Sequence, residues 1–209
     1  MSIIVWNCFD WIGFHITEKL LEEGEDVIGI HPVSNPQTEF LYGMVGRNAN
    51  FTFYESLMEV KDKTDEYIFV RPTEEDENQL TKSIEKENYL YIIEETEKKS
   101  KNFSRVLNGS ISTISLPPVI GPWMKEEEFQ AKKDSEDWIY VKEFTDWFHS
   151  FMQTSCKKEE VNLLPKNSFI QEKDRNTIVF TDNLNRRSVV KEIEEHLEKF
   201  SFYYDIKGI

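Results

Sequence analysis

The connection at residues 7–11 holds the side chains of this chain that are best placed for chemistry. Cys8 and Asp10 lie there, just before the expected first turn of a helix. A helix N-terminus stabilises a thiolate, so Cys8 could be a reactive thiol, but a small half-buried turn residue is the interpretation that we favour. The chain has four histidines: His15, His31, His149 and His196. None has a second histidine four residues along or a neighbouring cysteine, so their spacing predicts no metal site.

The residues on either side of this connection predict a strand, a helix and a second strand. Residues 3–6 form a continuous apolar run, which is typical of a strand buried on both faces. Apolar residues then recur at helical spacing from Ile12 to Leu20, and Gly24 follows where a helix favours a left-handed residue. Residues 27–30 form a second apolar run. Two parallel strands joined by a helix make a right-handed βαβ unit.

The rest of the chain continues the alternation of strands and helices. Further strands are expected at residues 51–54, 67–70, 111–116 and 177–180. Helical spacing of apolar residues predicts an amphipathic helix (Phe144, Trp147, Phe148, Phe151) and a last helix (Val189, Val190, Ile193, Leu197, Phe200) capped by Asn185 or Ser188. Residues 124–137 are expected to be loop or frayed helix. The polar stretch 73–101, whose apolar positions include Tyr91 and Ile92, is expected to form the solvated face of one or two helices.

Three segments, in the correct order, resemble one enzyme family. Residues 3–31 resemble the opening strand, glycine-rich turn, helix and second strand of the extended short-chain dehydrogenase/reductases, the NAD-dependent epimerase/dehydratase group. Residues 115–122, SLPPVIGP, resemble that family's R-P-x-x-V-Y-G-P strand end. Residues 137–144 resemble its d-f-v-y-V-d-D-v segment, and residues 176–197 then resemble its closing strand and helix.

The resemblance implies an α/β fold. The expected architecture is a Rossmann-like, doubly wound, mostly parallel sheet flanked by helices, with a small C-terminal α/β extension. We expect residues 1–209 to form a single domain. Within it, residues 1–122 would be the Rossmann-like core, and residues 123–209 would be an extension resembling the family's substrate-side region.

The resemblance also implies a cofactor, NAD or NADP, at the first turn. The three glycine positions of the family's turn are Asn7, Asp10 and Gly13 here, and the ribose-binding acid at the end of the second strand is His31. Asn tolerates the left-handed conformation of a tight turn, and Gly13 keeps the role of packing helix on strand. The residues expected at a cofactor or altered ligand pocket are Asn7, Phe9, Asp10, Trp11, Ile12, Gly13, His31 and Arg71.

Two features of this set have alternative interpretations. Trp6, Phe9 and Trp11 are expected mainly to fill space, and lining an altered pocket is the alternative. Arg71 follows a strand at the ligand edge of the sheet, where it could bind an anion. A surface ion pair with the acidic segment after it is the expectation that we favour.

Asp10 is the departure that most affects cofactor binding. Its carboxylate is expected where the pyrophosphate of a dinucleotide would lie. Two like charges about 4 Å apart repel by about 4 kcal/mol at an effective dielectric constant near 20. The helix N-terminus attracts an anion by only about 0.3–1 kcal/mol. We therefore expect a dinucleotide to bind weakly or not at all.

The catalytic residues that the resemblance implies are also altered. The family uses a Tyr-x-x-x-Lys pair, in which the lysine lowers the pKa of the tyrosine and binds ribose. Counting back without gaps from residues 121–122 places Tyr89 on the tyrosine and Ile93 on the lysine. A tyrosine with no cation beside it, near its reference pKa of about 10, is a poor base at neutral pH. Tyr203 and Lys207 are the one literal match to the motif, at the extreme C-terminus.

The chain is also short for the family. Between Pro72 and Tyr89 there is too little sequence for the helix, strand and Ser/Thr loop that the resemblance implies. The sheet is therefore expected to have lost an internal piece. The shortfall falls on the segment that should carry catalysis.

Composition narrows the choice of partners. The 209 residues include 25 Lys and Arg against 39 Asp and Glu, a net charge of −14, which argues against nucleic acid and against anionic membranes. No apolar run approaches the roughly 20 residues that a bilayer needs. Two cysteines make no disulfide framework, so a cytoplasmic protein is expected.

These observations favour a diverged, catalytically inactive relative of the epimerase/dehydratase family that acts as a ligand-binding or protein-interaction module. The first alternative is an active NAD(P)-dependent enzyme with a rearranged site, using Tyr89 or another base. The second alternative is a structural subunit whose acidic faces dock on a basic protein.

Overall fold

The computed structural model describes residues 2–61, 64, 66–73, 76, 89–96, 110–154, 160–166, 176–180 and 184–204. The strands are β1 (Ser2–Trp6), β2 (Asp26–Ile30), β3 (Phe51–Tyr54), β4 (Glu66–Val70), β5 (Tyr89–Glu95), β6 (Ser110–Leu116), β7 (Val119–Ile120), β8 (Ile139–Tyr140), β9 (Glu160–Leu164) and β10 (Thr177–Val179). The helices are α1 (Trp11–Glu22), α2 (Pro36–Val45), the 3-10 turn η1 (Leu57–Glu59), α5 (Glu126–Lys132), α6 (Val141–Met152), α7 (Arg186–Lys199) and α8 (Ser201–Tyr204).

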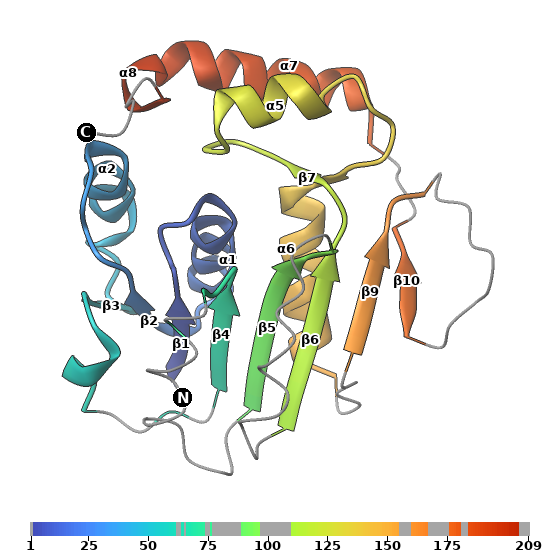
Figure 1. Cartoon of the computed structure of the whole chain (residues 1–209). Coiled ribbons are helices and arrows are strands. Elements are labelled where there is room, and N and C mark those ends of the chain that lie inside the picture. Colours follow the sequence, from blue (N-terminus) through green and yellow to red (C-terminus); the bar gives the residue numbers. More distant parts are fainter. Residues whose placement is uncertain are drawn as a thin grey trace.

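Eight of the ten described strands form one sheet in the order β10-β9-β6-β5-β4-β1-β2-β3, and every neighbouring pair in it is parallel (Figure 1). The chain runs outward from β1 to β3, returns to the middle, and then runs outward again from β4. This reversal is the mark of a doubly wound Rossmann-like fold. The predicted fold class is therefore confirmed, and the switch point lies between β1 and β4.

The predicted βαβ opening is confirmed in detail. Helix α1 packs closely on β1 because Gly13 has no side chain: a Cβ there would lie 2.1 Å from the Asn7 carbonyl oxygen. Gly24 follows α1 with φ at +83°, in the left-handed region that glycine tolerates best. The first turn is thus fixed by packing between the helix and the strand before it.

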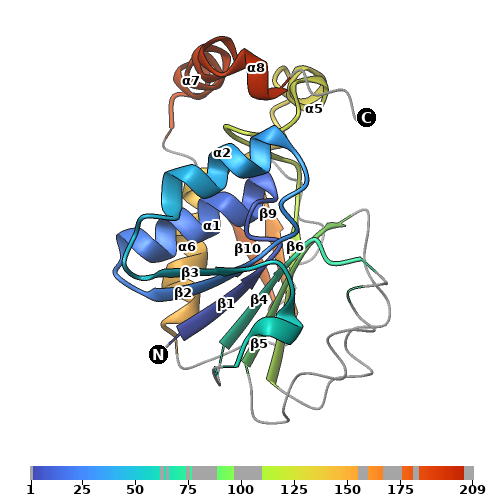
Figure 2. The same ribbon diagram turned by 90° about the vertical axis from the view of Figure 1, so that its left-hand side faces the viewer.

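Helices α1, α2 and α6 lie together on one face of the sheet (Figure 2). Their buried side chains form the larger apolar cluster, which includes Phe14, Leu41 and Phe148. A second cluster lies on the opposite face, where Trp6 packs with Phe69. The prediction that Trp6 fills space is therefore confirmed, and Trp6 does so on the face away from α1.

The interpretation of residues 89–95 as part of a helical stretch is wrong. These residues form β5, a central strand paired with β4 and β6. Residues 90–93 are all buried, which suits a parallel strand covered on both faces rather than one stripe of a helix. The remainder of the expected helical stretch, at 74, 75, 77–88 and 97–101, lies outside the described residues.

The expectation of a lost internal piece of sheet is also wrong, because β5 occupies the place between β4 and β6. The next connection along the chain is short. Strand β5 ends at Glu95 and β6 begins at Ser110, so only residues 96–109 join them.

The remaining predicted strands and helices are confirmed, and six described elements went unpredicted, among them the short η1, β7 and β8. Helix α7 begins after the N-cap Asn185, and α6 carries its predicted aromatic stripe. Residues within 124–137 form the short helix α5. Strand β9, helix α2 and α8 were not predicted; α2 begins at Pro36 behind a capping box made by Asn35 and Thr38.

The C-terminal part of the chain lies over the carboxyl ends of the strands. Helices α5, α7 and α8 form a layer above that edge of the sheet (Figure 1). The small β7–β8 pair connects this layer to the sheet. Within the described residues, no helix combines the length and the apolar character needed to cross a bilayer.

Candidate functional site

The carboxyl edge of the sheet at the switch point is closed by side chains of the first turn. Asn7 has φ at 60° and its Nδ2 donates a hydrogen bond to the Val70 carbonyl, 2.9 Å away. Arg71 has φ at 48° and its backbone N–H donates to the Ile93 carbonyl at 2.8 Å. Two non-glycine residues thus hold left-handed conformations where β1 and β4 end.

Asp10 caps the N-terminus of α1. Its Oδ1 accepts a hydrogen bond from the Ile12 backbone N–H at 3.1 Å. Its Oδ2 lies 3.2 Å from Nη1 of Arg71. The carboxylate therefore occupies the helix terminus at which the family resemblance expects a phosphate, and it is held by a hydrogen bond and by an ion pair.

Arg71 joins Asp10 to Glu95. Its Nη2 lies 3.3 Å from Oε1 of Glu95, and all three side chains are about one quarter exposed. The expected ion pair between Arg71 and the acidic segment after it is confirmed, because Glu95 belongs to the stretch 73–101. The second partner, Asp10 in the first turn, was not expected. Sequence reasoning missed Glu95 because β5 itself was not recognised.

Burial and charge act on Asp10 in opposite directions. Burial raises the pKa of the Asp10 carboxyl, whereas the Arg71 guanidinium and the amides of Ile12 and Gly13 lower it, and the nearby Glu95 raises it. The net direction is upward. A dinucleotide pyrophosphate does not fit this turn, because Asp10 already takes the donors that would hold it.

The place expected for ribose is filled by aromatic rings. The Phe9 ring lies 5.7 Å from that of His31 and 5.4 Å from that of Phe53, and the Tyr42 ring is 5.0 Å from that of Phe53. Burial lowers the pKa of His31 to about 4, so its ring is neutral near pH 7. Its buried Nδ1 has no hydrogen-bond partner among the described residues.

A cavity of about 340 Å³ opens beside this blocked turn, at the ends of β5, β6 and β9. Its lining residues are Trp11, Ile12, Glu95, Thr96, Leu116, Pro117, Pro118, Val119, Lys132, Asp137, Leu164 and Pro165. Of the predicted pocket residues, Trp11 and Ile12 therefore line a cavity, whereas Phe9 and His31 belong to the aromatic cluster. Asn7, Asp10, Gly13 and Arg71 build the turn between the two.

The reactive-thiol interpretation of Cys8 loses its support. Cys8 is fully buried, and burial raises the pKa of its thiol well above the ordinary value. Its Sγ lies close to Gly29 of β2, where an added Cβ would meet it at 2.8 Å. Cys8 is a packing residue of the first turn, more deeply buried than the alternative interpretation expected.

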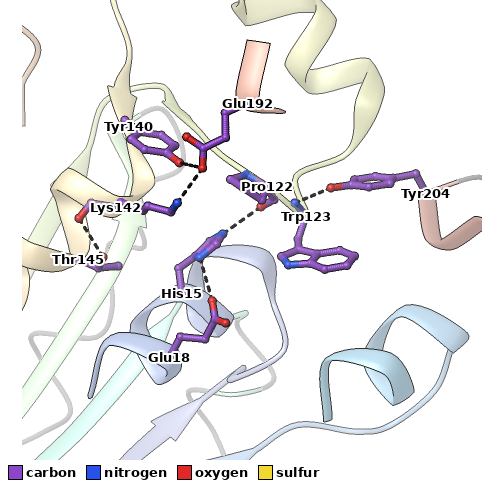
Figure 3. Close-up of polar contacts among 9 residues, drawn as sticks. All are labelled: His15, Glu18, Pro122, Trp123, Tyr140, Lys142, Thr145, Glu192 and Tyr204. Carbon is purple, nitrogen blue, oxygen red and sulfur yellow. Dashed lines mark hydrogen bonds and ion pairs between the residues drawn. The ribbon is translucent and has the colours of Figure 1, made fainter. Parts of the chain in front are cut away.

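A second polar cluster attaches the C-terminal helices to the core (Figure 3). Tyr204 accepts a hydrogen bond from the Trp123 backbone N–H at 2.7 Å, and its hydroxyl lies 2.8 Å from Nδ1 of His196. The pKa of His196 is lowered to about 4, mainly by burial, so its ring is neutral near pH 7. The Tyr204 hydroxyl therefore donates its proton to Nδ1 of His196. His15 donates from Nε2 to the Pro122 carbonyl at 3.1 Å.

A third set of contacts fixes α7 over the site. Oε1 of Glu192 accepts hydrogen bonds from the Tyr140 hydroxyl at 2.9 Å and from the Lys142 ammonium at 2.7 Å (Figure 3). Burial raises the pKa of Tyr140 to about 12, so its hydroxyl stays protonated. Both polar clusters hold helices in place, and neither lines the cavity.

The residues proposed to replace the family's catalytic pair lie in the wrong places. Tyr89 is the first residue of β5, so roughly 20 Å of strand separates it from the carboxyl edge. Ile93 is buried in the middle of the same strand. Tyr203 packs on Phe40, with ring centroids 4.3 Å apart, and Lys207 lies outside the described residues.

Comparison with known proteins supports the fold. No model of a protein family matches the sequence, and no curated protein matches it either. Solved structures do match. The Bordetella bronchiseptica enzyme WbmH, in complex with NAD⁺, is 10% identical to this chain. The match covers 95% of this chain and 99% of the WbmH chain, with a TM-score of 0.62.

Two further solved structures match over nearly their whole length. Yeast methylglyoxal/isovaleraldehyde reductase, in complex with NADPH, is 13% identical. The match covers 97% of this chain and 100% of the reductase chain, with a TM-score of 0.61. The UDP-glucose 4-epimerase of Thermotoga maritima, with UDP-glucose, is also 13% identical. The match covers 95% of this chain and 99% of the epimerase chain, with a TM-score of 0.60. At this identity the likeness establishes a shared fold.

Proposed function

We propose that this protein is a diverged member of the extended short-chain dehydrogenase/reductase family that binds a small ligand and has given up both the dinucleotide and the family's chemistry. The shared fold and the three matching sequence segments support the family. The blocked first turn and the short connection between β5 and β6 support the loss. The cavity beside the turn supports a retained binding role.

The observation that carries this proposal is the position of the Asp10 carboxylate. It accepts the Ile12 amide and pairs with Arg71, so the helix N-terminus and the adjacent cation are both occupied by the protein's own anion. A pyrophosphate would have to displace the Asp10 carboxylate from the Ile12 amide and from Arg71. Because Asp10 is part of the chain, its carboxylate always competes at a high effective concentration. The aromatic cluster around His31 opposes the nucleoside part in the same way, by filling space.

The loss of catalysis is supported by the connection between β5 and β6. The family resemblance implies a Tyr-x-x-x-Lys helix before the strand that ends in SLPPVIGP, which is β6. Residues 96–109 are all that joins β5 to β6, and they contain no tyrosine. The alternative of an active enzyme with Tyr89 as its base is disfavoured because Tyr89 lies at the opposite end of β5.

The proposed site of ligand binding is the cavity at the ends of β5, β6 and β9. A volume of about 340 Å³ lies at the lower end of the range typical of small-molecule pockets. The free, buried thiol of Cys8 fits a reducing compartment, and we propose the cytoplasm as the place of action.

A titration with reduced dinucleotides tests the proposal. NADH and NADPH fluorescence, followed as protein is added, should show no binding in the low-micromolar range, and calorimetry with NAD⁺ and NADP⁺ should show no heat of binding. Low-micromolar affinity for any of these dinucleotides would overturn the proposed loss of the cofactor, and turnover of a nucleotide sugar would overturn the proposed loss of catalysis. Absorbance near 340 nm in the purified protein would be an early sign of the same failure.

A further inference from the structure

We propose that the cavity at the ends of β5, β6 and β9 selects small ligands that have an apolar body and a protonated amine, with Glu95 as the partner of the amine. The inference rests on the proposed function, because it needs this cavity to be free of a dinucleotide. It reverses the charge preference of the solved structures described above that hold a dinucleotide, whose cofactor is an anion.

The charges that line the cavity favour a cation. Among the residues that the structure describes, the lining includes two carboxylates, Glu95 and Asp137, and one ammonium group, Lys132. Nζ of Lys132 also lies 3.9 Å from the Glu128 carboxylate, outside the lining, which offsets part of its charge. Arg71 offsets part of the charge of Glu95 but is shared with Asp10, so the described charges in and beside the lining are negative in sum and favour a ligand cation over an anion.

The position of Glu95 makes it the partner of the amine. One oxygen of its carboxylate contacts Arg71. The side chain is still 27% exposed and lines the cavity, so a ligand can reach the carboxylate. A carboxylate has two oxygens with about four acceptor positions, so it can hold a guanidinium and an ammonium together. Charge-assisted hydrogen bonds of this kind are about twice as strong as neutral ones.

The rest of the wall suits an apolar body. Trp11 and Ile12 come from α1, Leu116 and Val119 follow one another around the end of β6, and Leu164 ends β9. Trp11 is 92% buried, and its indole Nε1 has no hydrogen-bond partner among the described residues. Trp11 and Glu95 line the same cavity, and an aromatic ring together with a carboxylate favours an organic cation.

Three probes of one shape test the preference for a cation. 2-Phenylethylamine, 2-phenylethanol and 3-phenylpropanoate carry the same ring on chains of similar length and differ in charge. Calorimetry on the full chain should show the amine binding at least tenfold more tightly than the alcohol, with no detectable binding of the carboxylate. An amine that binds no more tightly than the alcohol, or does not bind at all, overturns the inference.

A charge-neutral variant tests the assigned partner. Glu95→Gln keeps the shape of the side chain and removes its charge, so the tenfold preference for the amine should disappear while affinity for the alcohol stays the same. Unchanged alcohol affinity shows that the cavity is intact. Glu127→Gln removes one exposed charge of α5 that does not line the cavity, and should leave the preference as it was.

The two proposals fail separately. If Glu95→Gln retains the full preference, the assignment of Glu95 is wrong. If the amine fails in the wild-type chain while NADH also fails to bind, the cation inference falls and the loss of the dinucleotide stands. If NADH binds tightly, the proposed function falls first.

Discussion

The guanidinium of Arg71 lies 3.2 Å from the carboxylate of Asp10, across the point where the sheet reverses direction. Arg71 follows β4 and Asp10 caps α1. The two residues come together because β1 and β4 are neighbouring strands. The pair places a built-in anion and its counter-ion where a Rossmann-like fold offers a helix N-terminus to a ligand. The ligand cavity is consequently displaced toward β5, β6 and β9.

Removing the built-in anion should open the turn to phosphate. In Asp10→Gly, the amide of Ile12 and the guanidinium of Arg71 become available to a ligand, and glycine at an N-cap costs only a few tenths of a kcal/mol. Calorimetry with inorganic pyrophosphate should show binding at millimolar concentrations that the wild-type chain lacks. Asp10→Asn, which can still accept the Ile12 amide, is the matched control and should not bind. A variant with glycine that remains as inert as the wild type would contradict the role of Asp10.

Arg71 should be costly to remove, and glycine should be the better replacement. Arg71→Ala leaves the Asp10 and Glu95 carboxylates without their shared cation, at a cost of about 1–3 kcal/mol in the free energy of unfolding. It also keeps a side chain at a φ of 48°. Arg71→Gly loses the same ion pairs but relieves the left-handed backbone, so it should be more stable than the alanine variant by about 1 kcal/mol. Urea unfolding of the two variants measures this difference in stability. Equal stability would mean that the backbone at Arg71 is not strained.

Two glycine-to-alanine changes should have opposite effects. Gly13→Ala places a Cβ 2.1 Å from the Asn7 carbonyl oxygen, so α1 must move off β1, at a cost of at least about 3 kcal/mol. Gly43→Ala, in the interior of α2, meets nothing within 4 Å and should stabilise the chain by about 0.5–1 kcal/mol through helix propensity. Thermal unfolding measures both. A neutral Gly13→Ala would show that the first turn is not packed as closely as the structure places it.

Stability should fall in mild acid. Burial lowers the pKa of His31 from 6.5 to about 4, so between those values the unfolded chain takes up a proton that the folded chain refuses. Folding free energy is therefore lost as the pH falls from about 6.5 to about 4, by at most about 1.4 kcal/mol per pH unit for this histidine.

His31→Phe should remove that contribution. The ring stays in the aromatic cluster and the buried Nδ1, which has no described partner, disappears, so the melting temperature at pH 7 should rise. Melting curves from pH 7 to pH 4.5 should fall less steeply than in the wild type, although not flatten completely, because the pKa of His196 is lowered as well. An equally steep curve would count against a buried, neutral His31.

Sequence alone determined the opening of this fold. Residues 3–30 carry a buried run, a helical stripe and a second buried run, and each pattern is local, so a βαβ unit follows without knowledge of the rest of the chain. The same holds for the packing role of Gly13 and for the start of α7, which the sequence narrowed to a cap at Asn185 or Ser188, since caps and close-packed glycines depend on near neighbours. Sequence also placed Asp10 at the helix N-terminus.

Tertiary structure decided what that carboxylate does. Its partner Arg71 is 61 positions away, and the pair forms only because β1 and β4 lie side by side. Strand β5 escaped prediction because a short apolar run inside a polar stretch fits a helix stripe as well as a strand, and only its neighbours β4 and β6 bury both of its faces. Trp11 and Ile12 of the cavity wall were predicted from the sequence, but Glu95 depends on that strand, so its place in the cavity was fixed by the order of the sheet.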